Sequence, residues 1–230
     1  MIQTNLSMKS KLIIIFVFFI TLSNSIGQDI KFEHFNENNG LSYNSVRHIV
    51  QDKNGFMWLG TFFGLNRFDG YQFKSYMSSE LGKKKIFNDD ITALELDKNS
   101  NELWIGTRKG LTLYQMDTNV FSTFFNDKNN PNSLSEDEIR SIHIDKYKRI
   151  WVGTMTKGIC IYYPKSNKFS KIKIKGFEYI KEIFEDQKGN IWIGSFGKAA
   201  VAKIVLGSKG EISKITTYTF RFTNEEMKKE

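Results

Sequence analysis

The sequence predicts an all-β fold of four four-stranded blades of a β-propeller, and three observations lead to this prediction. A short phrase with Trp and Gly recurs four times and accounts for all four tryptophans. The tryptophans are 46, 47 and 41 residues apart, a spacing typical of repeat architectures with one supersecondary unit per copy. Each copy also divides into four short apolar segments separated by turn residues, as propeller blades do.

The second repeat shows the four strands most clearly. Residues 91–96 alternate, 103–107 carry the tryptophan, 111–115 alternate again and 120–125 close the unit. The same pattern predicts blades at about residues 30–77, 86–126, 133–175 and 177–220.

Each repeat has the same residues at three structural positions. The turn between the first and second strands begins with an aspartate, whose carboxylate can bond the backbone two residues on. We expect each Trp to pack between neighbouring sheets with its indole N–H paired, and each Gly to let the next sheet approach closely. A ligand-stacking role for the tryptophans is the alternative. The positions are Trp58, Trp104, Trp151 and Trp192, followed by Gly60, Gly106, Gly153 and Gly194, with first-strand core residues Ile49, Leu94, Ile142 and Ile183.

The predicted blades form an incomplete ring. Residues 30–35 resemble a fourth strand, which would open the chain with the outer strand of a blade, yet residues 212–220 already supply the last outer strand. Open blades expose strand edges and apolar faces. We therefore expect residues 28–222 to be part of a larger, incomplete propeller, with a polar tail at 223–230 and with further blades or a second copy of the chain as partners.

The N-terminus indicates export. Lys9 and Lys11 precede an apolar run at 12–20, and small or polar residues follow it, which is typical of a signal peptide over residues 1–27, cleaved near Gly27. Either Met1 or Met8 fits as the start. The run is about half the length that a membrane helix needs, so a retained anchor is the weaker alternative, and no later segment predicts a membrane span. We expect a periplasmic or secreted protein.

Composition argues against several classes of function. The formal net charge is +8, but the basic residues are scattered, and lysines on the outer strand near 171–175 are a common defence against edge pairing, so no nucleic-acid partner is expected. The lone Cys160 is predicted to be a small buried strand residue. His34, His48 and His143 occupy unlike repeat positions, which argues against a metal site. We expect no cofactor, and no catalytic motif is present.

One aligned position suggests a binding site. Two residues before the first-strand core position, three of the four repeats have a basic residue, and this strand is the innermost of a propeller blade. Arg can form two parallel hydrogen bonds with one carboxylate or sulfate group, which would favour anionic sugars as ligands. The alternative is that these cations pair with acids of the loops. Loops between the second and third strands should open on the same face. The candidates are Arg47, Arg140 and Lys181 at the aligned position and Phe62, Phe63, Arg108, Lys109, Lys157 and Phe196 in the loops.

The amino-acid sequence of the first repeat resembles that of a known family. It reads Gly40-Leu41-Ser42, then Gln51-Asp52-Lys53-Asn54-Gly55, Trp58-Leu59-Gly60-Thr61 and Gly64-Leu65-Asn66-Arg67-Phe68-Asp69-Gly70. This resembles the two-component regulator propeller repeat, found in the extracytoplasmic sensor region of Bacteroidetes hybrid two-component systems. The resemblance spans about residues 30–222 and implies a sensor of oligosaccharides. The family's histidine kinase activity lies in C-terminal parts that these residues do not contain, and the fourth repeat lacks the Gly-Leu pair.

Two other classes of function stay open. A stand-alone secreted propeller module for protein or glycan binding would use the same blades. An extracytoplasmic lyase or glycosidase would need convergent acids or a base, and the acids at 136–138 are better explained as a solvated loop.

Overall fold

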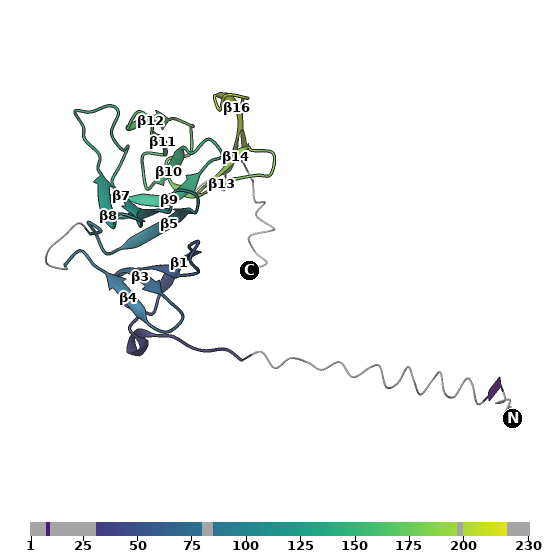
Figure 1. Cartoon of the computed structure of the whole chain (residues 1–230). Helices are drawn as coiled ribbons and strands as arrows, with labels where there is room; N and C mark the ends of the chain where they lie inside the picture. Colours follow the sequence, from purple (N-terminus) through teal and green to yellow (C-terminus); the bar gives the residue numbers. More distant parts are fainter. Residues whose placement is uncertain (1–7, 10–30, 80–84, 197–199, 220–230) are drawn as a thin grey trace, which may run out of the picture. The chain divides into compact units, whose positions relative to one another are not determined.

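The computed structural model describes residues 8–9, 31–79, 85–196 and 200–219, and its strands form four separate antiparallel sheets (Figure 1). Each sheet is a meander of four consecutive strands, which confirms the predicted fold class. Contacts divide the chain into residues 1–34 and residues 35–230, and all the described strands lie in the second unit. Among the described residues, no helix has the length and hydropathy that crossing a bilayer requires.

The strand bounds follow the repeats closely. Blade 1 has the short 3-10 helix η1 (Glu37–Asn39), β1 (Val46–Gln51), β2 (Met57–Thr61), β3 (Gly64–Phe68) and β4 (Phe73–Tyr76). Blade 2 has β5 (Ile91–Asp97), β6 (Glu102–Thr107), β7 (Gly110–Gln115) and β8 (Val120–Phe124). Blade 3 has β9 (Ile139–Ile144), β10 (Ile150–Thr154), β11 (Ile159–Tyr163) and β12 (Lys168–Ile172). Blade 4 has β13 (Ile180–Glu185), β14 (Ile191–Ser195), β15 (Ala200–Leu206) and β16 (Ile212–Thr219).

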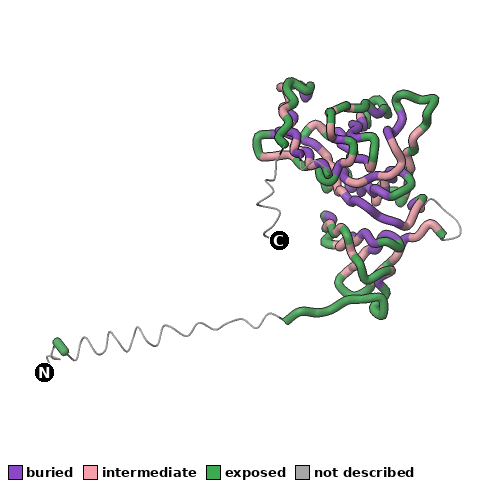
Figure 2. The backbone as a smooth tube through the Cα atoms, turned by 180° about the vertical axis from the view of Figure 1, so that it is seen from behind, coloured by how far each residue is buried: buried purple, intermediate pink, exposed green. Residues whose placement is uncertain are grey.

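Neighbouring blades meet along their first strands. Strand β1 lies beside β5, β5 beside β9 and β9 beside β13, so these four strands are innermost, as a propeller requires. Buried residues are concentrated in the second and third strands of each blade, whereas β1 and β16 contain none. Exposed residues lie mainly toward the outside of the folded part (Figure 2). Cys160 is fully buried on β11, as predicted, and burial raises the pKa of its thiol.

Glycine makes the close approach between blades possible. A Cβ on Gly60 would lie 2.7 Å from Ile91 Cγ2 of the next blade, and one on Gly106 would lie 2.7 Å from Ile139 Cγ2. Gly153 has the same relation to Ile180. A branched side chain that begins each first strand therefore fills the space left by the glycine of the blade before it, which confirms the predicted role of these three glycines.

The repeats at the two ends depart from this pattern, and two predictions were wrong there. Ile49 was expected in the core, but 55% of it is exposed, whereas its counterparts Leu94, Ile142 and Ile183 are at most 6% exposed. A Cβ on Gly194 would meet only Glu182 Cβ of its own blade, at 4.0 Å. The cause is the same at both ends, because no described sheet packs against these two faces.

The predicted leading outer strand is also absent from the residues that the structure describes. Residues 31–35 have no regular secondary structure, and Ile30 lies outside the described residues. Phe35 instead packs its ring 4.8 Å from the ring of Phe68 and 5.9 Å from that of Phe73, on blade 1.

The turn aspartates do more than cap the backbone. Oδ1 of Asp52, Asp145 and Asp186 accepts the N–H two residues on, as predicted, while Oδ2 of each accepts the indole N–H of the tryptophan six residues on, at 2.8 Å. One carboxylate thus fixes both the turn and the tryptophan. The predicted pairing of the indole N–H is confirmed for Trp58, Trp151 and Trp192.

The second repeat breaks this rule. Asp97 is seven residues before Trp104, and its carboxylate accepts hydrogen bonds from Lys148 Nζ of blade 3 at 2.8 and 2.9 Å. No described residue accepts a hydrogen bond from Trp104 Nε1, so the prediction of a paired indole N–H was wrong for this copy. The extra residue in the turn moves Asp97 away from the ring.

We expect Gly106→Ala to destabilise the fold and Gly194→Ala to leave it nearly unchanged. A methyl group at residue 106 would overpack the contact with Ile139 and cost about 1–3 kcal/mol, whereas residue 194 has room for it and should change stability by less than about 0.5 kcal/mol. Urea unfolding of both variants measures the difference. Equal losses would contradict the packing role assigned to Gly106.

Asp186 should make the fold sensitive to acid. The hydrogen bond from Trp192 and those from Asn190 hold the pKa of the Asp186 carboxyl well below its usual range. A carboxyl with a lowered pKa contributes stability that is present above its unfolded pKa, about 3.9, and is lost as the pH falls through the folded pKa. The thermal midpoint of Asp186→Asn should therefore fall less steeply between about pH 4 and pH 2 than that of the parent chain. Parallel pH profiles would contradict this role.

Candidate functional site

A polar cavity of about 490 Å³ opens where the innermost strands begin. All four blades contribute to it, because the first strands lie side by side there. Its lining contains four cations, contributed by β1, the β6–β7 turn, β9 and β13. The lining residues are Arg47, His48, Thr92, Arg108, Arg140, Tyr179, Ile180, Lys181 and Glu182.

A β-bulge in each first strand presents the aligned side chain to this cavity. The pairing register of all four first strands breaks at one residue, which leaves that residue without a partner on the second strand. Bulges bend a strand and redirect a side chain, and they are common beside functional sites. The four unpaired residues are Arg47, Thr92, Arg140 and Lys181, the position that the sequence singled out.

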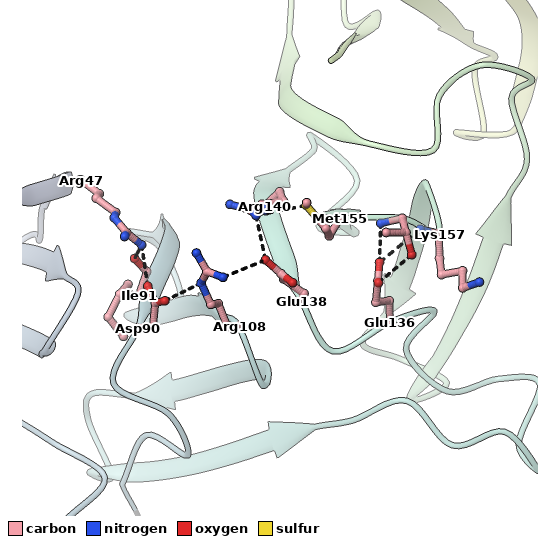
Figure 3. Close-up of polar contacts among 10 residues, drawn as sticks. Arg47, Asp90, Ile91, Arg108, Glu136, Glu138, Arg140, Met155 and Lys157 are labelled. Carbon is pink, nitrogen blue, oxygen red and sulfur yellow. Dashed lines mark hydrogen bonds and ion pairs between the residues drawn. The ribbon is translucent and has the colours of Figure 1, made fainter. Parts of the chain in front are cut away.

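Ion pairs link the arginines of three blades in a row (Figure 3). Asp90 takes Arg47 Nη1 on one oxygen and Arg108 Nε on the other, both at 2.5 Å. Glu138 lies 2.7 Å from Arg140 Nη2 and 3.7 Å from Arg108 Nη1. The alternative that the aligned cations pair with loop acids is therefore realised for Arg47 and Arg140, but no ion pair of Lys181 is found among the described residues. We call this row the arginine–acid ladder.

The ladder leaves a positive excess in the cavity. The four lining cations exceed the three acids Asp90, Glu138 and Glu182 by one charge, and Lys181 makes no ion pair with a described residue. Thr92 is only 7% exposed, and its Oγ1 has no hydrogen-bond partner among the described residues. A buried hydroxyl without a partner is costly, which makes Thr92 a ready donor to a ligand.

His48 adds a titratable group to the same lining. Burial lowers the pKa of its imidazole, and Arg47 and Lys181 act in the same direction, while a backbone hydrogen bond involving Thr92 and the charge of Glu182 oppose it. His48 is therefore neutral at pH 7 and becomes cationic only in acid.

Aromatic rings flank two of the arginines. The Arg47 guanidinium lies 5.3 Å from the centre of the Phe62 ring, and that of Arg140 lies 5.4 Å from the centre of Tyr179. These cation–π contacts hold the guanidinium planes in place. The Phe62 ring also lies 6.2 Å from that of Tyr43.

The predicted loop residues divide into two groups. Arg108 lines the cavity, and Phe62 supports Arg47 at its edge. The other four are not in the lining. Phe63 packs 5.0 Å from Tyr43, Phe196 packs 5.3 Å from Tyr179, Lys109 is exposed at the β6–β7 turn, and Lys157 lines a separate cavity beside β12.

The acids of the ladder were not predicted. Asp90 and Glu138 each lie two residues before the aligned position, and the same repeat position holds Tyr179 in blade 4. In blade 1 this position holds Ser45, so only two of the four repeats have an acid there and the pattern is weak. His48 and Glu182, one residue after the aligned position, were also missed. In the described part of the chain, no three His, Cys, Asp or Glu side chains converge as a metal site would require.

Comparison with known proteins finds a match in three of the four repeats. The sequence pattern described as "Two component regulator propeller" matches residues 40–63, 133–156 and 176–197. A 67-residue stretch is 40% identical to Histidine kinase P4 of Formosa agariphila, covering 29% of this chain and 5% of that protein.

Solved structures give the same result. The extracellular domain of a hybrid two-component system, BT3049 of B. thetaiotaomicron, superposes with a TM-score of 0.71 and is 26% identical, covering 82% of this chain and 26% of that one. A second such domain, BT4673 from the same organism, gives a TM-score of 0.64 at 23% identity, covering 86% of this chain and 28% of that one. The chain thus spans about a quarter of the length of these extracellular domains.

We expect the pKa of the His48 imidazole to lie below its ordinary value and to change when its charged neighbours are replaced. Glu182→Gln should lower the pKa further, because it removes a charge that favours the imidazolium, and Lys181→Met should raise it. NMR titration of the His48 ring protons in the three proteins measures this. Shifts of the same sign in both variants would contradict the arrangement.

Proposed function

We propose, from the premise that the repeats of this chain belong to the two-component regulator propeller family, that the chain is an extracytoplasmic ligand-sensing region of a hybrid two-component system. The match to the family pattern and the likeness to extracellular domains of such systems support this assignment. The signal output would then lie in parts of the system outside these residues. The predicted signal peptide at 1–27, which falls largely outside the described residues, supports a periplasmic or secreted location.

The ligand that we propose is an oligosaccharide with a carboxylate or sulfate group, bound in the cavity of the four cations. The single observation that carries the proposal is that all four first strands bulge at the residue that faces this cavity, and three of these residues are basic. A cavity that repeats one feature in every blade surrounds a ligand from several sides. Arginine and lysine donate strong charge-assisted hydrogen bonds to such anions, and Thr92 and Tyr179 suit sugar hydroxyls.

The arrangement supports binding without catalysis. The acids of the ladder are already engaged by arginines, which leaves them poorly placed to act as general acid or base. The proposed role of the cavity is therefore recognition, and the proposed partner is a small extracellular ligand.

The two uncovered faces support a further part of the proposal, that additional blades or a second copy of the chain pack there. On blade 4, the rings of Phe184, Trp192 and Tyr218 stack with centres 6.4 and 6.1 Å apart, and Phe184 is 51% exposed. On blade 1, Ile49 is exposed. Apolar faces of this kind usually mark an interface.

Binding of an anionic disaccharide should respond in opposite ways to two substitutions. Lys181→Met removes the cation without an ion pair and should weaken binding about tenfold, whereas Glu138→Gln frees Arg140 and should strengthen it several-fold. Isothermal titration calorimetry with an unsaturated uronic-acid disaccharide, with and without sulfate, measures both.

A neutral disaccharide serves as the control ligand, and Lys109→Met, outside the cavity lining, serves as the control variant. Binding that responds equally to Lys109→Met and Lys181→Met would contradict the proposed site. Equal affinity for neutral and anionic sugars would leave the cavity as a sugar site but contradict the anionic ligand.

A further inference from the structure

The turn between β5 and β6 has one more residue between its aspartate and its tryptophan than the other three turns of its kind. Asp52, Asp145 and Asp186 are six residues before their tryptophans, and Asp97 is seven residues before Trp104. Because of this insertion, Asp97 turns to Lys148 of blade 3 and no longer caps the indole.

A cavity of about 330 Å³ lies where the cap would be. It lies between the turns of blades 2 and 3, at the opposite end of the strands from the arginine–acid ladder. The turn at 97–102 forms one side, and Trp104, Ile144, Ile150 and Pro164 supply the apolar walls.

The indole edge of Trp104 is the polar group of interest in these walls. Trp104 is 2% exposed, and the rings of Phe124 and Tyr162 lie 5.9 and 5.5 Å from it, so stacking on its faces is not available to a ligand. In the other blades the indole N–H points to the aspartate turn, and here that turn borders the cavity. Among the described residues, Trp104 Nε1–H has no acceptor, whereas its counterparts in the other three blades each donate to an aspartate, so this N–H is open to a ligand.

We propose that this cavity is a second ligand site, which takes a small neutral acyl group such as the acetamido group of an N-acetylated sugar. The carbonyl oxygen accepts the hydrogen bond from Trp104 Nε1–H, and the methyl group contacts Ile144, Ile150 and Pro164. Two observations favour a neutral group over an anion. Asp97 and Glu102 border the cavity, and the one lysine there, Lys148, is already held by Asp97.

The four indole N–H signals of the ¹⁵N-labelled chain provide a direct test. The Trp104→Phe variant identifies the Trp104 signal by its loss. Titration with N-acetylglucosamine should shift the Trp104 signal and leave those of Trp58 and Trp151 unchanged, because their N–H groups are held by aspartates. Glucose, which has no acetamido group, should shift none.

Two variants test whether the inserted residue and the cavity cause the response of the Trp104 signal. Deletion of Asn99 restores the six-residue spacing, which should return Asp97 to the indole and weaken the response at least tenfold. Ile144→Phe fills the cavity without changing the turn and should have the same effect, which keeps the test valid if the deletion variant does not fold. Lys181→Met, in the other cavity, should leave the response intact, so that failure of this site is distinguishable from failure of the proposed anionic site.

An unmoved Trp104 signal at saturating N-acetylglucosamine would overturn the proposal. So would an unchanged response in a folded Ile144→Phe variant. A shift of all four indole signals together would indicate a general change of the fold and would also overturn it.

Discussion

The close approach of consecutive first strands is the constraint on which the rest of this structure depends. A branched residue at the start of one strand occupies the volume that glycine leaves vacant on the blade before it, and this contact occurs at each of the three blade junctions. This contact fixes the distance between neighbouring innermost strands. Because these strands lie so close together, side chains from all four blades reach one cavity. The buried tryptophans stabilise the junctions farther out, but they could not do so if the glycines carried side chains.

The carboxylates of the first turn show how one residue can link local and long-range structure. In blades 1, 3 and 4, one oxygen closes a turn and the other holds a tryptophan, so the turn and the packed ring form together. In blade 2 the same carboxylate joins two blades through Lys148. One inserted residue therefore exchanges a contact within a blade for a contact between blades.

The sequence supports the fold further than it supports the site. The Trp-Gly phrase, the turn aspartates and the strand alternation are local patterns that repeat four times, and they predicted the strands of the second repeat to within a few residues. The exposure of Ile49 and the vacant space beside Gly194 could not be predicted by aligning repeats, because equivalent residues in different blades have different neighbours. The aligned basic position was found, but its ion pairs join Arg47 to Asp90 across 43 residues, and such a pairing has no local signature.

The arginine–acid ladder makes the cations of three blades interdependent. Each acid is shared, so an anion that engages Arg140 would leave Glu138 to Arg108, and Arg108 would then hold Asp90 less strongly. Arg47, two blades away, would gain a larger share of Asp90 in return. A charge that arrives on one side of the cavity would thus be felt on the other side through a redistribution of existing ion pairs.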